Sequence, residues 1–256
     1  MNEHGLYAAA LNFPENAVYM RKNKDKTNIA PFEFIPFILG KCKTAAEAKA
    51  LLEHVNILST DFSENMKNTP LHWFVADKTF AFAAEPMAKG LVLTEDFAGV
   101  LTNEPPLDYH LTNLRNFLSI TAKEPQNRFA QNIDLAPYSR GMGGIGLPGD
   151  YSSASRFVKT VFIKENSPAE KTGEAAVTQV FHILENIAMP NGSVCVAKGF
   201  EKTVYSSCAE AESGIYYYKT YNNSRICAVD MHKENLEGNK LASYPMLFKQ
   251  DVLWQN

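Results

Sequence analysis

Runs and alternations of apolar residues divide the chain into an opening group of strands, a helical middle and a closing group of strands. Residues 6–13, LYAAALNF, form an unbroken apolar run that is typical of a buried strand. Short apolar segments in hairpin succession predict further strands at 71–77, 80–85, 91–94 and 98–102. Near the end of the chain, tyrosine-rich and β-branched segments predict strands at 202–210, 214–221 and 225–231.

Helical spacing marks the segments between these strands. The predicted helices span 31–39, 45–56, 107–118, 152–165 and 174–187. Thr44 and Glu47 have the spacing of a capping box, which predicts that the second helix begins just after Thr44. In the fourth helix the apolar residues Phe157, Val158, Val161 and Phe162 share one face. His182 stands among apolar neighbours of the last helix, which favours a packed histidine over a catalytic base.

The order strands, helices, strands predicts an α+β fold, in which two antiparallel sheets pack face to face between helix layers. No internal repeat or linker interrupts the 256 residues, so we expect one domain over 1–256. This length can bury a substantial core.

Net charge and composition limit the classes of partner that the chain is expected to bind. A net charge of −3 predicts no nucleic-acid surface and no polybasic membrane patch. No apolar run is long enough to span a bilayer and no signal peptide stands at the start, which favours a soluble, cytoplasmic protein. The four cysteines lack metal-ligand spacing and are expected to be buried free thiols. They are Cys42, Cys195, Cys208 and Cys227.

Residues 138–157, YSRGMGGIGLPGDYSSASRF, hold five of the chain's 14 glycines and end in a helix start. We expect a tight loop that shapes a pocket, with Arg156 as a cation at its rim. Gly141 to Gly146 also match G-x-G-x-x-G. No strand precedes this match and Pro148 follows it, so a dinucleotide site is not favoured. Without further information, a glycine-rich turn with no ligand role stays an alternative.

Two other segments carry candidate site residues. The polar loop 59–70 contains Phe62 and Met66, which either tuck back onto the core or wall an apolar ligand pocket. Asn103 ends the strand predicted at 98–102 and precedes Glu-Pro-Pro. Its amide is placed to face a site, although a turn-forming asparagine is an equally simple interpretation.

The glycine-rich stretch closely resembles a segment of the choloylglycine hydrolases, which include the bile salt hydrolases and the penicillin V acylases. Other matching stretches follow the same order along the chain, and together they cover nearly all of it. They are 5–19, 69–77, 99–114 and 214–236. The resemblance implies the αββα sandwich of the N-terminal nucleophile hydrolases, hydrolysis of a linear amide C–N bond, and no cofactor or metal.

The resemblance also assigns roles. Asn12 matches the asparagine of the oxyanion hole, and Asn103 matches the asparagine that orients the N-terminal residue and the substrate amide. Arg156 matches the arginine that stabilises charge at that centre. These roles are physically reasonable, since amide donors favour an oxyanion and a guanidinium favours thiolate over thiol. Phe62 and Met66 match the loop that lines the steroid pocket, and Asn12 favours conjugated bile salts because penicillin acylases typically have tyrosine there.

One departure from the family is large. The family's nucleophile is an N-terminal cysteine whose own α-amino group acts as base, in a segment of about seventy residues with no counterpart here. None of the four cysteines is N-terminal, so we expect the chain as printed to be a truncated, inactive form with an exposed sheet edge.

Several alternatives stay open. The first hypothesis is the family reaction, hydrolysis of glycine- or taurine-conjugated bile salts. The second hypothesis is another enzyme, a penicillin V or N-acyl-homoserine lactone acylase. A non-catalytic remnant that binds bile acids and a non-functional fragment are the others. The resemblance also implies a homo-oligomer, since tetramers are common among related enzymes.

Overall fold

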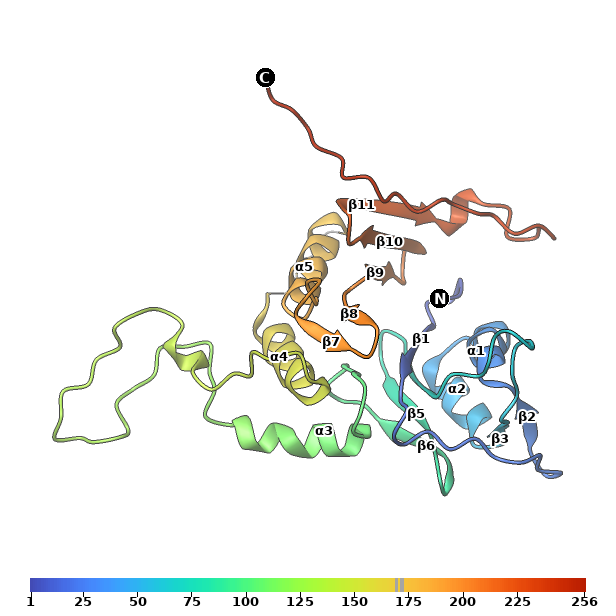
Figure 1. The fold of residues 1–256 in the computed structure, drawn as a ribbon, viewed down its shortest axis with the longest axis horizontal. Helices are drawn as coiled ribbons and strands as arrows, with labels where there is room; N and C mark the ends of the chain where they lie inside the picture. Colours follow the sequence, from blue (N-terminus) through green and yellow to red (C-terminus); the bar gives the residue numbers. More distant parts are fainter. Residues whose placement is uncertain (169, 171–172) are drawn as a thin grey trace.

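A four-stranded antiparallel sheet forms one half of the molecule in the computed structural model, which describes residues 1–168, 170 and 173–256 (Figure 1). Its strands run in the order β1-β4-β5-β6. They are β1 (Tyr7–Asn12), β4 (Leu71–Ala76), β5 (Ala81–Met87) and β6 (Gly90–Glu95). Because β1 lies at the sheet edge, it is half-buried rather than fully buried as its apolar run predicted. The register pairs Asn12, the last residue of β1, with Leu71.

Helices α1 (Phe34–Lys41) and α2 (Ala45–Leu52) cover one face of this sheet. Together they enclose the larger core, in which Phe34 stacks on Trp73 with ring centroids 4.1 Å apart. A short 3-10 helix, η1 (Pro31–Glu33), precedes α1. The predicted helix start after Thr44 is confirmed at α2, because the Thr44 hydroxyl accepts a hydrogen bond from the Glu47 backbone N–H. The second bond of a capping box differs from the prediction, since the Glu47 carboxylate accepts from the N–H of Lys43 rather than from that of Thr44.

A second antiparallel sheet contains the closing strands in the order β11-β10-β9. They are β9 (Tyr205–Glu210), β10 (Ile215–Thr220) and β11 (Asn223–Asp230). Helix α5 (Gly173–Glu185) packs against β9 and against helix α4 (Ser153–Asn166). Helix α3 (Leu107–Asn113) continues into the 3-10 helix η2 (Leu114–Phe117) and packs on α4. The predicted α+β class with two antiparallel sheets is therefore confirmed.

The strand predicted at 98–102 is wrong. The Asp96 carboxylate accepts the backbone N–H groups of Ala98, Gly99 and Val100 at 2.9–3.0 Å. These donors are then not available to a neighbouring strand, and the segment forms a turn. Burial raises the pKa of the Asp96 carboxyl to about 6, although the three N–H donors oppose the shift.

Two small sheets were not predicted from the sequence. Strands β2 (Thr27–Ile29) and β3 (Val55–Ile57) pair in parallel, and β3 takes residues that the helical spacing assigned to the second helix. Strands β7 (Val194–Val196) and β8 (Gly199–Glu201) form a hairpin between α5 and β9. Strands of three residues are too short for an alternating pattern to reveal.

Two predictions about single residues need correction. His182 is exposed on α5 and faces Glu185 across one turn, so it is not a packed histidine. All four cysteines are free as predicted, but only Cys42 is buried, while Cys195 is exposed. Among the described residues, no helix has the length and apolar character needed to cross a bilayer.

Residues 118–147 project from the rest of the molecule as a long loop (Figure 1). The neck of this loop closes where the Thr121 N–H donates to the Gly143 carbonyl at 2.9 Å. A Cβ at Gly143 would lie 2.1 Å from the Lys123 carbonyl oxygen, so only glycine fits there. The glycine-rich stretch therefore closes the neck of the loop, and the helix that carries Arg156 begins after it.

Candidate active site

Three of the predicted site residues come together although they lie far apart in the sequence. Asn103 donates from Nδ2 to the backbone carbonyl of Asn12 at 2.8 Å. Its Oδ1 accepts a hydrogen bond of 2.6 Å from Nη2 of Arg156. The Asn103 amide thus joins the end of β1 to the first turns of α4, and both of its functional groups are in use.

Asn12 presents its side chain to solvent at this point. Its backbone carbonyl is the group that Asn103 binds, so the position of the Asn12 Cα is fixed while its side-chain amide stays exposed. An exposed amide donor can bind a developing negative charge. The geometry is consistent with the roles that the sequence resemblance implies for Asn12 and Arg156.

Arg156 is held by its own helix as well as by Asn103. Its Nε donates to the Tyr151 carbonyl at 3.0 Å, just before the helix begins. Burial lowers the pKa of the Arg156 guanidinium, and the nearby Glu201 carboxylate opposes this shift. An arginine stays charged despite such a shift, so the site holds one positioned cation.

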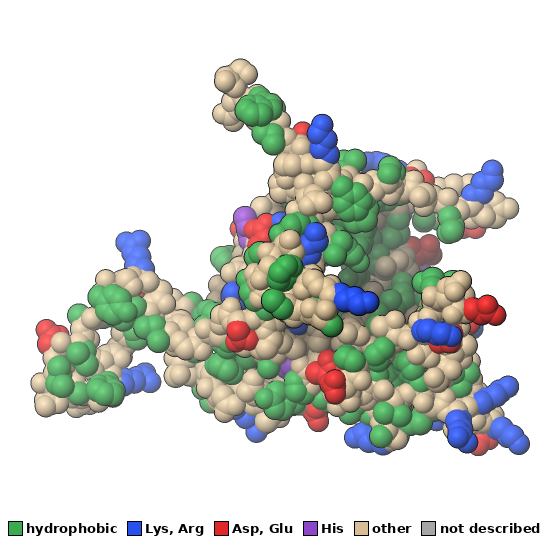
Figure 2. All heavy atoms as spheres, viewed as in Figure 1, with side chains coloured by type: hydrophobic (Ala, Val, Ile, Leu, Met, Phe, Trp, Pro, Cys, Tyr) green, Lys and Arg blue, Asp and Glu red, His purple; other side chains and the backbone are tan. Residues whose placement is uncertain are grey.

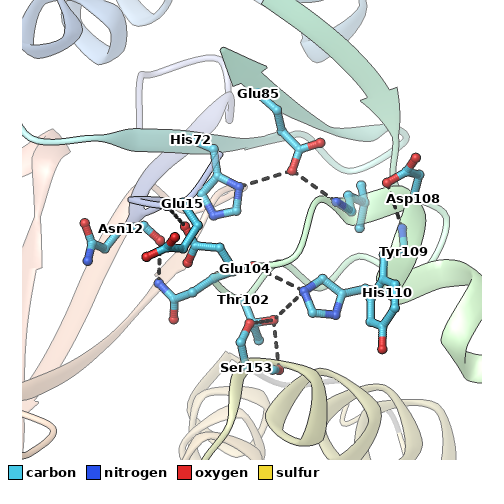
Figure 3. Close-up of polar contacts among 12 residues, drawn as sticks. Asn12, Glu15, His72, Glu85, Thr102, Glu104, Asp108, Tyr109, His110 and Ser153 are labelled. Atoms are coloured by element: carbon cyan, nitrogen blue, oxygen red, sulfur yellow. Dashed lines mark hydrogen bonds and ion pairs between the residues drawn. The ribbon is translucent and has the colours of Figure 1, made fainter. Parts of the chain in front are cut away.

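The backbone around Asn103 is anchored by a buried polar group. The Thr102 hydroxyl donates to the Ser153 carbonyl at 3.1 Å and accepts from the Ser153 hydroxyl at 3.0 Å. Nε2 of His110 lies 3.2 Å from the Asn103 carbonyl oxygen and 3.5 Å from the Thr102 hydroxyl. Figure 3 shows His110, Thr102 and Ser153 meeting between α3 and α4.

A second buried group fixes the start of α3. Nδ1 of His72 lies 3.2 Å from Oε1 of Glu85, and the same oxygen accepts the backbone N–H of Leu107 at 3.0 Å (Figure 3). The His72 and Glu85 side chains are 0% and 2% exposed. His72 also stacks on Phe13, the residue after Asn12, with centroids 4.2 Å apart. This group therefore connects α3 with the end of β1.

The loop that carries Phe62 and Met66 leads directly to this site. The Phe13 N–H donates to the Pro70 carbonyl at 2.8 Å, which places the end of the loop next to Asn12. Phe62 and Met66 are 61% and 60% exposed, so neither tucks back onto the core. Phe62 instead meets the half-exposed ring of Phe32 edge-on at 5.1 Å.

The sequence did not indicate His72, Glu85, Thr102 or His110 as parts of this site. Each of the four is at least 97% buried. A histidine or glutamate inside an apolar strand or helix is the one local sign that such a residue has a buried polar partner. That sign does not identify the partner.

Comparison with known proteins places this chain in a family. Residues 1–244 match the family described as linear amide C-N hydrolases, choloylglycine hydrolase family. The chain belongs to the choloylglycine hydrolase family. A bile salt hydrolase/transferase of Lactiplantibacillus plantarum is 45% identical over 247 residues, which cover 96% of this chain and 76% of that protein.

Two solved structures show the same fold as this chain. The structure of a variant of conjugated bile acid hydrolase from Clostridium perfringens matches with a TM-score of 0.92 and 35% identity, over 100% of this chain and 79% of that chain. Penicillin V acylase from Agrobacterium tumefaciens matches with a TM-score of 0.71 at 20% identity, covering 91% of this chain and 65% of that one. At 20% identity, the likeness to penicillin V acylase shows that the fold is shared and nothing more. The fold and the enzyme class expected from the sequence, that of a linear-amide C–N hydrolase, are therefore confirmed.

Proposed function

We propose that this choloylglycine hydrolase acts on glycine- or taurine-conjugated bile salts at the site formed by Asn12, Asn103 and Arg156. The observation that carries the proposal is the Asn103 bridge, which binds the Asn12 carbonyl and Arg156 at once. The 45% identity to a bile salt hydrolase/transferase supports the substrate class. A single domain over 1–256 and a cytoplasmic location stay predictions.

In this proposal each of the three residues has a separate role at the scissile amide. The exposed Asn12 amide donates to the oxygen as negative charge develops on it. Asn103 orients the scissile amide, and Arg156 stabilises negative charge at the centre. The nucleophile that the family resemblance implies is an N-terminal cysteine.

The decisive test compares two forms of the protein. The form made by its source organism is purified, weighed by intact mass spectrometry and assayed for release of glycine or taurine from conjugated bile salts. A polypeptide of the 256 residues alone, with a mass of 28.5 kDa, is assayed beside it. We expect the second form to bind bile acid without releasing an amino acid. Hydrolysis by it would contradict the requirement for an N-terminal cysteine.

A second candidate activity is cleavage of penicillin V or an N-acyl-homoserine lactone. The structural likeness to a penicillin V acylase is the observation that keeps it open. Assays of the source-made protein with each substrate separate the two. A higher kcat/KM for penicillin V than for taurocholate would overturn the bile salt proposal.

Replacing Phe62 with alanine is expected to weaken cholate binding about 10-fold or more. The exposed ring lies on the loop that ends beside Asn12, and burying a phenylalanine against an apolar ligand contributes about 1.5–3 kcal/mol. Isothermal titration calorimetry with the 256-residue polypeptide measures the change. Phe97→Ala is the control, since Phe97 is 79% exposed on the turn that follows β6. Equal affinities of the Phe62→Ala variant and the unmodified protein for cholate would show that the loop is not part of the binding site.

We further propose that the protein forms a homo-oligomer through the projecting loop 118–147. Apolar side chains gather on this loop in Figure 2. Those of Leu118, Phe129 and Tyr138 are 84–91% exposed. A patch of this kind on an extended loop is typical of a surface that another chain covers. Sedimentation velocity of the source-made protein tests this, and a monomer at micromolar concentration would contradict it.

A further inference from the structure

His110 lies behind the candidate site and touches it through one ring nitrogen. The ring is completely buried, and Nε2 lies 3.2 Å from the Asn103 carbonyl oxygen. A carbonyl oxygen only accepts hydrogen bonds, so this contact requires a proton on Nε2. The proton position follows from the neighbouring groups.

The Thr102 hydroxyl supports the same proton position. It lies 3.5 Å from Nε2, but its hydrogen already points to the Ser153 carbonyl at 3.1 Å. It therefore faces His110 with a lone pair, and both neighbours of Nε2 are acceptors. Burial lowers the pKa of His110, which favours a neutral ring with a single proton. Nδ1, which has no partner among the described residues, then carries only a lone pair.

The ring cannot easily turn away from this contact. It stacks on Phe157 of α4, with centroids 4.7 Å apart and an interplanar angle of 13°. Helix α3, which carries His110, is tied to β5 through the Leu107 N–H and the Glu85 carboxylate. Two elements therefore fix the direction of the Nε2–H group.

We infer that His110 is a positioning residue for the candidate active site, because its Nε2–H fixes the Asn103 carbonyl and with it the direction of the Asn103 side chain. The backbone of Asn103 has this restraint on one side, while its side chain bridges the Asn12 carbonyl and Arg156. If the Asn103 peptide rotated, both side-chain bonds would be misaligned. The effect on turnover rests on the function proposed above, but the effect on the Asn103 amide does not.

Two substitutions distinguish the effect of the His110 N–H donor from the effect of its aromatic ring. His110→Phe keeps an aromatic ring that stacks on Phe157 but removes the donor. His110→Gln removes the ring but keeps an N–H donor. His182→Gln, on the exposed face of α5, is the control. In 15N-labelled protein, the solvent exchange rate of the Asn103 side-chain NH2 is measured by NMR, with its signal assigned from an Asn103→Ser sample.

We expect the Asn103 NH2 to exchange slowly in the unmodified protein and in the glutamine variant, and rapidly in the phenylalanine variant. In the source-made protein, kcat of the phenylalanine variant should fall about 10- to 100-fold with little change in KM, as for a small misplacement of a site group. The glutamine variant should recover most of that loss. Slow exchange and unchanged kcat in a folded phenylalanine variant would overturn the inference.

If the His110→Phe variant does not fold, a measurement on the unmodified protein tests the role of His110 instead. The 15N shifts of the His110 ring report which nitrogen carries the proton. We expect the Nε2–H form at neutral pH, and the Nδ1–H form would overturn the inference. If the unmodified source-made protein hydrolyses no bile salt, the proposed function fails, while the exchange and tautomer measurements still decide the role of His110.

Discussion

Replacing Asn12 with alanine is expected to lower kcat for conjugated bile salts by about 10²–10³-fold in the source-made protein, the range measured when one oxyanion donor is removed. The Asn12 side chain is exposed at the site, and the residue's structural contact with Asn103 is made by its backbone carbonyl. Alanine keeps that carbonyl. The substitution therefore removes a donor without removing the bond that holds the site together.

The kinetic pattern distinguishes this role from simple damage to the fold. An interaction made only in the transition state lowers kcat and kcat/KM by the same factor, whereas lost substrate binding raises KM. Asn12→Asp is the sharper variant, because it keeps the shape and replaces the amide donor with an acceptor. Asn116→Ala, in the exposed η2 segment, is the control. If Asn12→Asp kept full kcat, Asn12 would not be the oxyanion donor.

Features determined by neighbouring residues were predicted well from the sequence. The start of α2 just after Thr44 was predicted correctly, and the start of α4 was predicted to within one residue. In each case a side chain binds a backbone group within three or four residues. The failure at 98–102 is also local, because the Asp96 carboxylate competes with strand pairing for three N–H groups. An apolar pattern alone contains no information about that competition.

The candidate site was predicted only in part. Family resemblance indicated Asn12, Asn103 and Arg156, but not the bonds between them, which span 91 and 53 residues. The buried group behind them was missed, since His72 and Glu85 occur on strands that otherwise read as apolar. Their pairing depends on strand register, which places both side chains on the same face of the sheet. Register is set only when the sheet assembles, so the sequence of either strand alone does not reveal the pair.

Removal of the buried Glu85 side chain is expected to destabilise the fold strongly. Glu85→Ala should lower the free energy of unfolding by about 3–5 kcal/mol, as when one partner of a buried pair is removed. The carboxylate is 2% exposed and accepts from both His72 and the Leu107 N–H. Alanine leaves both donors buried without an acceptor. Urea unfolding followed by the fluorescence of Trp73, a fully buried tryptophan next to His72, measures the loss.

Two further variants identify the cause of that loss. Glu85→Gln keeps one oxygen acceptor and removes the charge, so it should cost about 1–3 kcal/mol. Glu95→Ala removes an exposed carboxylate from the end of β6, the strand next to β5, and should change stability by less than about 0.5 kcal/mol. If Glu85→Ala and Glu95→Ala unfolded at the same urea concentration, the buried pair would contribute nothing. If instead Glu85→Ala alone is destabilised and the Asn103 amide also exchanges faster in it, then the pair that holds α3 in place also supports the site through His110.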